Sequence, residues 1–285
     1  MALTINTNLS SIVAQNNLAK ATTSLNKAIE RMTTGYKINH AGDNAAGYSI
    51  ARNWETQLGS LDVAADNAAM GADMMSTLED HYSLVSTHLQ RVRDLTEQAA
   101  NGTYGSASLK AIKSEITARL EEVDRITASC EYNGRKMMNG SIENSINLQV
   151  GLYSGNDSHI TLDSSLFAKA DIATLFGEDK SVVASKCAGL NDGTTAASML
   201  DKIDSVIKEI SNRTTTLGAA QNRIDSAIES IGVQSENITS SLSTLRDANI
   251  AEESSKYIQS QILQQAAATL LSTANQTPSI ALNLL

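Results

Sequence analysis

The chain has little of what the core of a compact globular enzyme usually contains. Pro278 is the single proline among 285 residues, and aromatic residues make up only 4% of the sequence. Proline interrupts helices and large aromatic side chains fill globular cores. This composition therefore favours long, uninterrupted helices with thin cores of Ala, Leu, Ile and Met. Cys130 and Cys187 are too few for a disulfide scaffold, and the sequence leaves open whether they pair.

Long hydrophobic runs and an excess of basic residues are absent as well. No stretch reaches the roughly 20 apolar residues that a membrane-spanning helix requires. The N-terminal residues MALTINTNLSSIV lack a basic segment followed by an apolar one, so we expect no cleaved signal peptide. The net charge of −9 argues against a nucleic-acid partner, because phosphate binding needs a basic face. We expect neither membrane insertion nor nucleic-acid binding.

Catalytic sequence motifs are also missing. The chain has no P-loop, no G-x-G-x-x-G and no G-x-S-x-G motif. His81 and His88 share a helix face, but no third ligand follows at helical spacing, so a solvated helix face explains them better than a zinc site. The sequence predicts a protein that is not an enzyme and holds no cofactor or metal.

Apolar residues near both ends of the chain recur at helical spacing. Near the start they follow each other at intervals of three and four residues, which is typical of a coiled-coil seam. Near the end of the chain the apolar residues cover a broader face of the predicted helix. Isolated helices of this kind are marginally stable in water, so both ends are predicted to pair with other helices. The residues predicted to make this packing are Leu18, Leu25, Met32, Ile258, Ile262, Leu263, Leu270 and Leu271.

The same periodicity predicts helices over most of the remaining chain, with one interruption. The fold expected is mainly α, an elongated antiparallel helical bundle or coiled coil with a small β-hairpin region in mid-chain, where apolar residues alternate in 146–152 and 160–162. The Ala-, Gly-, Ser- and Asp-rich residues 168–195 are expected to form an irregular, exposed tip. The predicted helices span residues 4–34, 43–100, 106–129 and 196–273.

Several stretches of the sequence are similar to those of one family, the bacterial flagellins. They are MALTINTNLSSIVAQNNL, RMTTGYKINHAGDNAAGYSIA, RVRDLTEQAANGTYG and EYNGRKMMNG in the N-terminal half, and LGAAQNRI, STLRDANIAEE and ILQQAAATLLSTANQTPSIALNLL in the C-terminal half. The chain thus resembles a short flagellin without the large variable outer domains. The resemblance implies an inner coiled-coil domain made of residues 1–42 and 248–285. Residues 43–247 would form an outer rod, with its hairpin at about 140–175 and its tip at about 168–195.

The resemblance also implies a function and partners. The chain would polymerise into the flagellar filament for swimming motility, and its terminal helices would fold on assembly. It would leave the cell through the flagellar type III apparatus without a cleaved signal peptide. Its partners would be other copies of itself, an export chaperone, the filament cap and the hook–filament junction proteins. Two alternatives are a junction protein, and a secreted adhesin or enzyme that uses flagellin ends for export.

The stretch QRVRDLTEQ resembles the region that animal Toll-like receptors recognise in flagellins. Carried over to this chain, the receptor-binding residues would be Gln90, Arg91, Leu95, Gln98 and Glu115. Alternatively, these residues mainly make contacts between subunits of the filament.

The chain departs from the family pattern at two places. Asp43-Asn44 stands where the family usually has an acidic pair, and Asp247-Ala248-Asn249 replaces its Asp-Ala-Asp. The loss of two carboxylates is expected to affect local packing or salt sensitivity.

Overall fold

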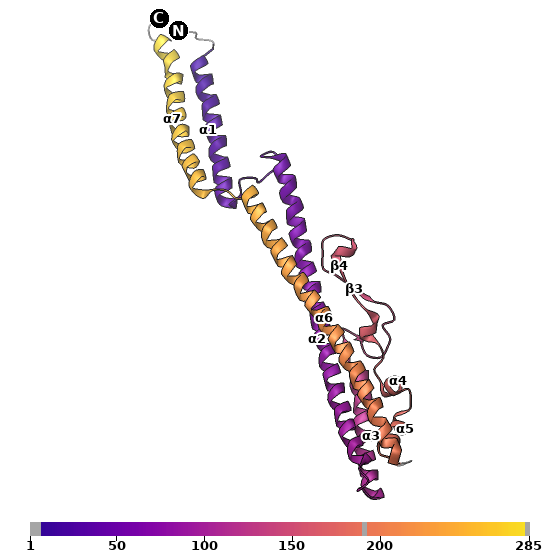
Figure 1. Ribbon diagram of the computed structural model, residues 1–285. Helices are drawn as coiled ribbons and strands as arrows, with labels where there is room; N and C mark the ends of the chain where they lie inside the picture. The colour runs from indigo at the N-terminus through magenta and orange to yellow at the C-terminus, as the bar shows by residue number, and fades with distance from the viewer. Residues whose placement is uncertain (1–6, 190–192, 283–285) are drawn as a thin grey trace. The chain divides into compact units, whose positions relative to one another are not determined.

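The computed structural model describes residues 7–189 and 193–282 and is 77% helical. Contacts divide the chain into two compact units. One combines the residues up to 58 with those from 236 onward, and the other comprises residues 59–235 (Figure 1). The mainly α fold with a mid-chain β-hairpin is confirmed. No helix of the described residues is long and apolar enough to cross a membrane.

The first unit contains a pair of terminal helices. Helix α1, Leu9–Thr34, and helix α7, Ile250–Leu282, lie side by side (Figure 1). Asn8 begins α1 by accepting a hydrogen bond from the Ser11 amide at 3.1 Å. Gly35 ends it with a φ of 77°, a conformation that glycine adopts without strain. Of the predicted helix 4–34, residues 4–6 lie outside the described part of the chain.

Asn44 and Asn249, the two positions at which the chain departs from the family pattern, each precede the first residues of a helix. Asn44 precedes α2, Ala45–Ala100, and its Oδ1 accepts the Gly47 amide at 3.0 Å. Asn249 precedes α7, and its Oδ1 accepts the Ala251 amide at 3.1 Å. Asparagine and aspartate cap helices about equally well. The amide side chains therefore keep the capping role at both positions.

Helix α6, Gly193–Arg246, ends three residues before α7 begins. The prediction of one continuous helix over residues 196–273 is therefore wrong. The reason is local: the Asn249 side chain satisfies the first amides of α7, and Asp247 pairs instead with Tyr36 in an isolated β-bridge. The apolar periodicity continues through this break, so periodicity alone does not reveal it.

The second unit has a core between the remaining parts of α2 and α6 and helix α3, Ser106–Ser129. Helices α2 and α6 run antiparallel, since Arg93 pairs with Asp204 at 2.6 Å and Gln221 donates to Glu79 at 2.9 Å. Their buried side chains recur at intervals of three and four residues. The fully buried large side chains of this core include Leu61, Met75, Leu78, Tyr82, Leu89, Leu95, Ile116 and Leu120.

Two antiparallel hairpins follow α3. Strands β3, Ile146–Gln149, and β4, His159–Leu162, pair with Ile146 opposite Leu162, which confirms the predicted hairpin. Strands β1, Glu131–Tyr132, and β2, Arg135–Lys136, form a shorter one that the sequence analysis missed. Asn133 and Gly134 between them have φ of 48° and 77°. An Asn-Gly pair with two positive φ angles is the usual two-residue hairpin turn, so the signal was present in the sequence.

The prediction of an irregular, exposed tip at 168–195 is wrong for residues 170–188. They form helices α4, Ile172–Phe176, and α5, Lys180–Cys187, whose first turns are capped by Asp171 and Asp179. Helix α5 packs against α3. These helices are too short to show a periodic pattern, and their many small residues conceal the apolar ones. The buried side chains are Ala170, Ile172, Phe176, Val183, Ala184, Cys187 and Ala188.

Both cysteines are free thiols in this unit. Cys130 and Cys187 are fully buried, and burial raises the pKa of each thiol to about 11. The question that the sequence left open is answered in favour of unpaired, protonated cysteines.

Candidate functional site

The face of α1 that packs on α7 is an alternation of small and large apolar side chains. Ala14, Ala21 and Ala28 are buried, with 2–8% of their surface exposed. The larger side chains of the predicted set, Leu18, Leu25 and Met32, are half-buried at the intervening positions. Alternation at intervals of three and four is the geometry of a two-helix coiled coil. Alanine at every buried position allows the two backbones to approach closely.

The face of α7 that packs on α1 combines polar and apolar residues. Glu253, Ser260 and Ala267 are buried there at seven-residue intervals. Tyr257, Gln264 and Leu271 on the same face are half-buried. Of the apolar α7 residues predicted for packing, only Leu271 lies on this seam.

The other predicted α7 residues lie outside the pairing with α1. Ile258, Ile262, Leu263 and Leu270 are 55%, 60%, 53% and 62% exposed. At 100° per residue, Ile258 and Ile262 lie opposite the seam, whereas Leu263 and Leu270 flank it. A helix with apolar residues on all sides is normally surrounded by other elements. Helix α7 therefore has more apolar surface than α1 covers, and the spacing of its apolar residues does not distinguish these faces.

A groove runs along the flank of the pair beside Leu263 and Leu270. Its first part, about 340 Å³, lies between these leucines and Ala14, Asn17 and Lys20. A second part of about 500 Å³ shares Leu270, Ala14 and Asn17 and reaches the start of α1. There Leu9 and Val13 are 68% and 51% exposed. Side chains of both helices thus form one open, largely apolar surface.

Polar contacts join the two helices along their whole described length. Near the start of α7, Glu253 accepts from Arg31 at 3.3 Å, and in the middle Gln264 donates to Thr22 at 3.1 Å. At the other end Asn8 donates to the Ala274 carbonyl at 2.7 Å. These contacts show that α1 and α7 run antiparallel.

The α1–α2 connection and the α6–α7 connection lie in the same unit and are joined by hydrogen bonds. The Lys37 amide donates to the Arg246 carbonyl at 2.7 Å, and the Ala248 amide donates to the Gly35 carbonyl at 2.8 Å. The Arg246 guanidinium lies 4.2 Å from the centre of the Tyr36 ring and pairs with Glu55. The Arg246 side chain, which is 14% exposed, thereby links α6, the α1–α2 connection and α2.

The structure brings together most of the residues predicted to bind a receptor. Gln90, Arg91 and Gln98 are exposed on α2, and both Nε and Nη2 of Arg91 donate to Glu115 Oε1 on α3, at 3.0 and 2.9 Å. Leu95, the remaining residue of the predicted set, is 2% exposed and belongs to the core. It lies three residues after the buried Val92, on the core side of the helix.

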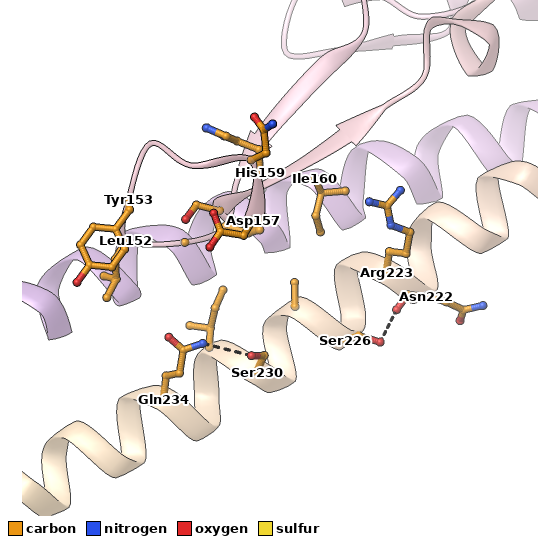
Figure 2. A pocket seen from close by; sticks show the side chains of 16 residues that line it. Leu152, Tyr153, Asp157, His159, Ile160, Asn222, Arg223, Ser226, Ser230 and Gln234 are labelled. Atoms are coloured by element: carbon orange, nitrogen blue, oxygen red, sulfur yellow. Dashed lines mark hydrogen bonds between the residues drawn. The ribbon is translucent and has the colours of Figure 1, made fainter.

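A polar groove of about 820 Å³ lies between the β3–β4 connection and α6 (Figure 2). The two serine hydroxyls that α6 contributes are engaged within that helix: Ser226 donates to the Asn222 carbonyl at 2.8 Å, and Ser230 accepts from Gln234 at 3.2 Å. Among the described residues, His159 Nδ1 is the one buried side-chain nitrogen or oxygen atom without a hydrogen-bond partner. These contacts do not pair a nucleophile with a base.

Comparison with known proteins identifies the chain. Its residues 5–143 match the profile of the bacterial flagellin N-terminal helical region, and residues 200–285 match that of the C-terminal helical region. A flagellin of Halalkalibacterium halodurans is 32% identical over 281 residues, which cover 99% of each chain. The chain belongs to the bacterial flagellin family. A flagellin of Xenorhabdus nematophila is 34% identical over 313 residues and covers both chains completely.

Membership of the flagellin family settles the general role of the chain. It is a structural subunit of the flagellar filament and not an enzyme, and secretion and motility follow from the family. A solved structure described as a flagellar hook-associated protein of Vibrio parahaemolyticus shares the fold. It has a TM-score of 0.60 at 14% identity and covers 72% of this chain and 100% of its own. That likeness concerns the fold alone, whereas the flagellin relatives match throughout.

Proposed function

We propose that the subunit polymerises through its terminal helices, which become ordered when other copies cover the outer faces of α7 and the groove beside it. The observation that carries this proposal is the exposure of Ile258, Ile262, Leu263 and Leu270 at 53–62%, on a helix whose seam with α1 buries Glu253 and Ser260 instead. These four apolar side chains gain little from the pairing with α1. Neighbouring copies would supply the missing apolar contacts.

The energy available from this surface is large enough to drive association. Full burial of a Leu or Ile side chain is worth about 1.5–3 kcal/mol. Because slightly more than half of each side chain remains exposed, covering one contributes roughly 1–2 kcal/mol, and covering all four contributes roughly 3–7 kcal/mol. Since 1.4 kcal/mol corresponds to a tenfold change in affinity, this is about a 10²- to 10⁵-fold gain in affinity.

The same apolar faces support the proposed partners of the subunit before and during assembly. An export chaperone would cover the exposed face of α7 until the chain leaves the cell through the type III apparatus without a cleaved signal peptide. Cap and hook–filament junction proteins would meet the ends of the growing filament. In this arrangement residues 1–42 and 248–285 form the inner domain and residues 43–247 the outer one.

Receptor recognition is a second proposed use of the outer domain. Gln90, Arg91 and Gln98 of α2 present polar groups to solvent, and Glu115 of α3 fixes the Arg91 guanidinium. A Toll-like receptor would bind this surface in the free subunit. In the filament the same residues would make contacts between subunits, which we take as their primary role.

Seeded assembly tests the polymerisation proposal. Purified, depolymerised subunit is mixed with filament seeds in ammonium sulfate, which strengthens apolar burial, and is viewed by electron microscopy. We expect long filaments from the intact chain and none from a variant lacking residues 1–35 and 251–285. Circular dichroism checks that the variant keeps its second unit folded. Filaments from the shortened variant, or none from the intact chain, would contradict the proposal.

A further inference from the structure

The seam of α1 does not define its own register against α7. Ala14, Ala21 and Ala28 occupy equivalent positions in successive heptads, and Leu18 and Leu25 occupy the positions between. A slip of α7 by seven residues would place a similar side chain at every contact. Coiled coils with such repetitive apolar seams obtain their register from polar residues.

The seam of α7 differs from one heptad to the next. The buried residues at seven-residue intervals are Glu253, Ser260 and Ala267, so each heptad of α7 offers a different group to α1. The polar groups are concentrated towards the start of the helix. A slipped alignment therefore changes the contacts of α7 even though it leaves those of α1 nearly the same.

Glu253 is the most demanding of these groups. Its side chain is 6% exposed, and its Oε1 lies 3.3 Å from Arg31 Nη1 and 3.0 Å from Lys256 Nζ. A slip of one heptad along α1 would place Ser24 where Arg31 stands. The buried carboxylate would then keep only Lys256 as a counter-charge and lose the ion pair with α1, which is unfavourable. Gln264 would likewise lose its hydrogen bond to Thr22.

We infer that the Arg31–Glu253 ion pair, supported by the Gln264–Thr22 hydrogen bond, maintains the register of α1 against α7 beyond the connection that the Ala248–Gly35 backbone hydrogen bond aligns. This inference rests on the proposed polymerisation, because the register decides where along the pair Ile258 and Ile262 meet other copies. The ion pair lies next to the backbone hydrogen bond between Ala248 and Gly35. The hydrogen bond aligns the segments between the helices, and the ion pair continues this alignment into α1 and α7. Arg31 and Glu253 are thus positioning residues for assembly.

Distances between spin labels in filaments test the inference. Labels on Asn26→Cys and Ser272→Cys lie apart along the helix axes, so a slip of one heptad changes their separation by about 10 Å. Cys130 and Cys187 are fully buried and remain unlabelled. Labelled subunits are diluted with unlabelled wild-type chain, so that only distances within one chain are measured. The readout is the distance distribution, together with helix content from circular dichroism.

The wild-type labelled subunit is expected to give one narrow distribution. With Glu253→Leu we expect unchanged helix content but a second population displaced by about 10 Å, because leucine packs equally well in either register. The matched control is Glu252→Leu. Glu252 also pairs with Lys256, at 2.8 Å, but its side chain is 62% exposed, so the narrow distribution should remain.

Charge exchange separates positioning from simple packing. Arg31→Glu alone should broaden the distribution or prevent assembly, and Arg31→Glu combined with Glu253→Arg should restore a single distance and filament formation. A single wild-type distance in Glu253→Leu filaments would overturn the inference, as would a double variant that fails to recover. If the wild-type subunit itself does not polymerise, the proposed function fails instead.

Discussion

Replacing Ile262 with serine is expected to weaken filament assembly without destabilising the free subunit. Ile262 is 60% exposed, and isoleucine and serine have similar helix propensities. Full burial of an isoleucine contributes about 1.5–3 kcal/mol. The part that remains exposed therefore contributes roughly 1–2 kcal/mol when a neighbouring copy covers it. Because 1.4 kcal/mol corresponds to a tenfold change in an equilibrium constant, the critical concentration for polymerisation should rise roughly 5- to 30-fold.

The critical concentration is measured as the subunit left in solution after filaments have been pelleted at equilibrium. Gln261→Ser is the matched control, because Gln261 is an exposed polar neighbour on the same helix and should change this concentration by less than twofold. Thermal unfolding of the free subunit should be the same for both variants. An unchanged critical concentration for Ile262→Ser would refute the reasoning that another copy covers this face.

Three further outcomes follow from the structure. Arg91→Asp should greatly reduce Toll-like receptor signalling in a cell reporter assay, since it removes the guanidinium and places a carboxylate beside Glu115; unchanged signalling would contradict the receptor proposal. The thiols of Cys130 and Cys187 should react with a thiol reagent at pH 8 only after unfolding. Because the pKa of about 11 in the folded chain exceeds the ordinary 9.0, the unfolded chain loses its thiol protons first as the pH rises. The free energy of unfolding, measured by denaturant titration, should therefore fall between pH 9 and pH 11. Cys→Ala variants should lack this pH dependence. Gly71→Ala should destabilise the second unit by at most about 1 kcal/mol, because its Cβ would lie 2.4 Å from Leu148 Cδ1 while alanine itself favours the helix, and Leu148→Ala should relieve the added clash in a double-mutant cycle.

Much of the helical fold follows from the sequence because long helices carry strong periodic patterns. The helix 106–129 was predicted with the bounds that the structure shows, and the long α2 ends at Ala100 as expected. Seven-residue repeats in α1 also identified its packing face. Periodicity succeeds where one face of a helix is covered by one partner.

Periodicity does not distinguish the faces of a helix that is apolar on several sides. Most of the large apolar residues of α7 lie outside its seam with α1. The apolar pattern in the sequence therefore singles out Ile258 and Ile262, whereas α1 packs on Glu253 and Ser260. Burial of polar residues depends on their specific partners. Only the structure shows that Arg31 lies across from Glu253.

The short helices and the position of Leu95 did not follow from the sequence for different reasons. Helices α4 and α5 contain too few residues for a pattern, and their capping residues Asp171 and Asp179 are as common in loops as at helix starts. Leu95 was assigned from the family resemblance alone. Its spacing from the buried Val92 places it on the core side of α2.

Amide hydrogen exchange of the free subunit and of the filament, followed by mass spectrometry, tests the central claim most directly. The account predicts fast exchange of residues 9–34 and 250–276 in the free subunit and strong protection in the filament, whereas the core residues 75–95 are protected in both. Protection of the terminal helices already in the free subunit would contradict folding on assembly. Rapid exchange of these helices within the filament would contradict their role in polymerisation.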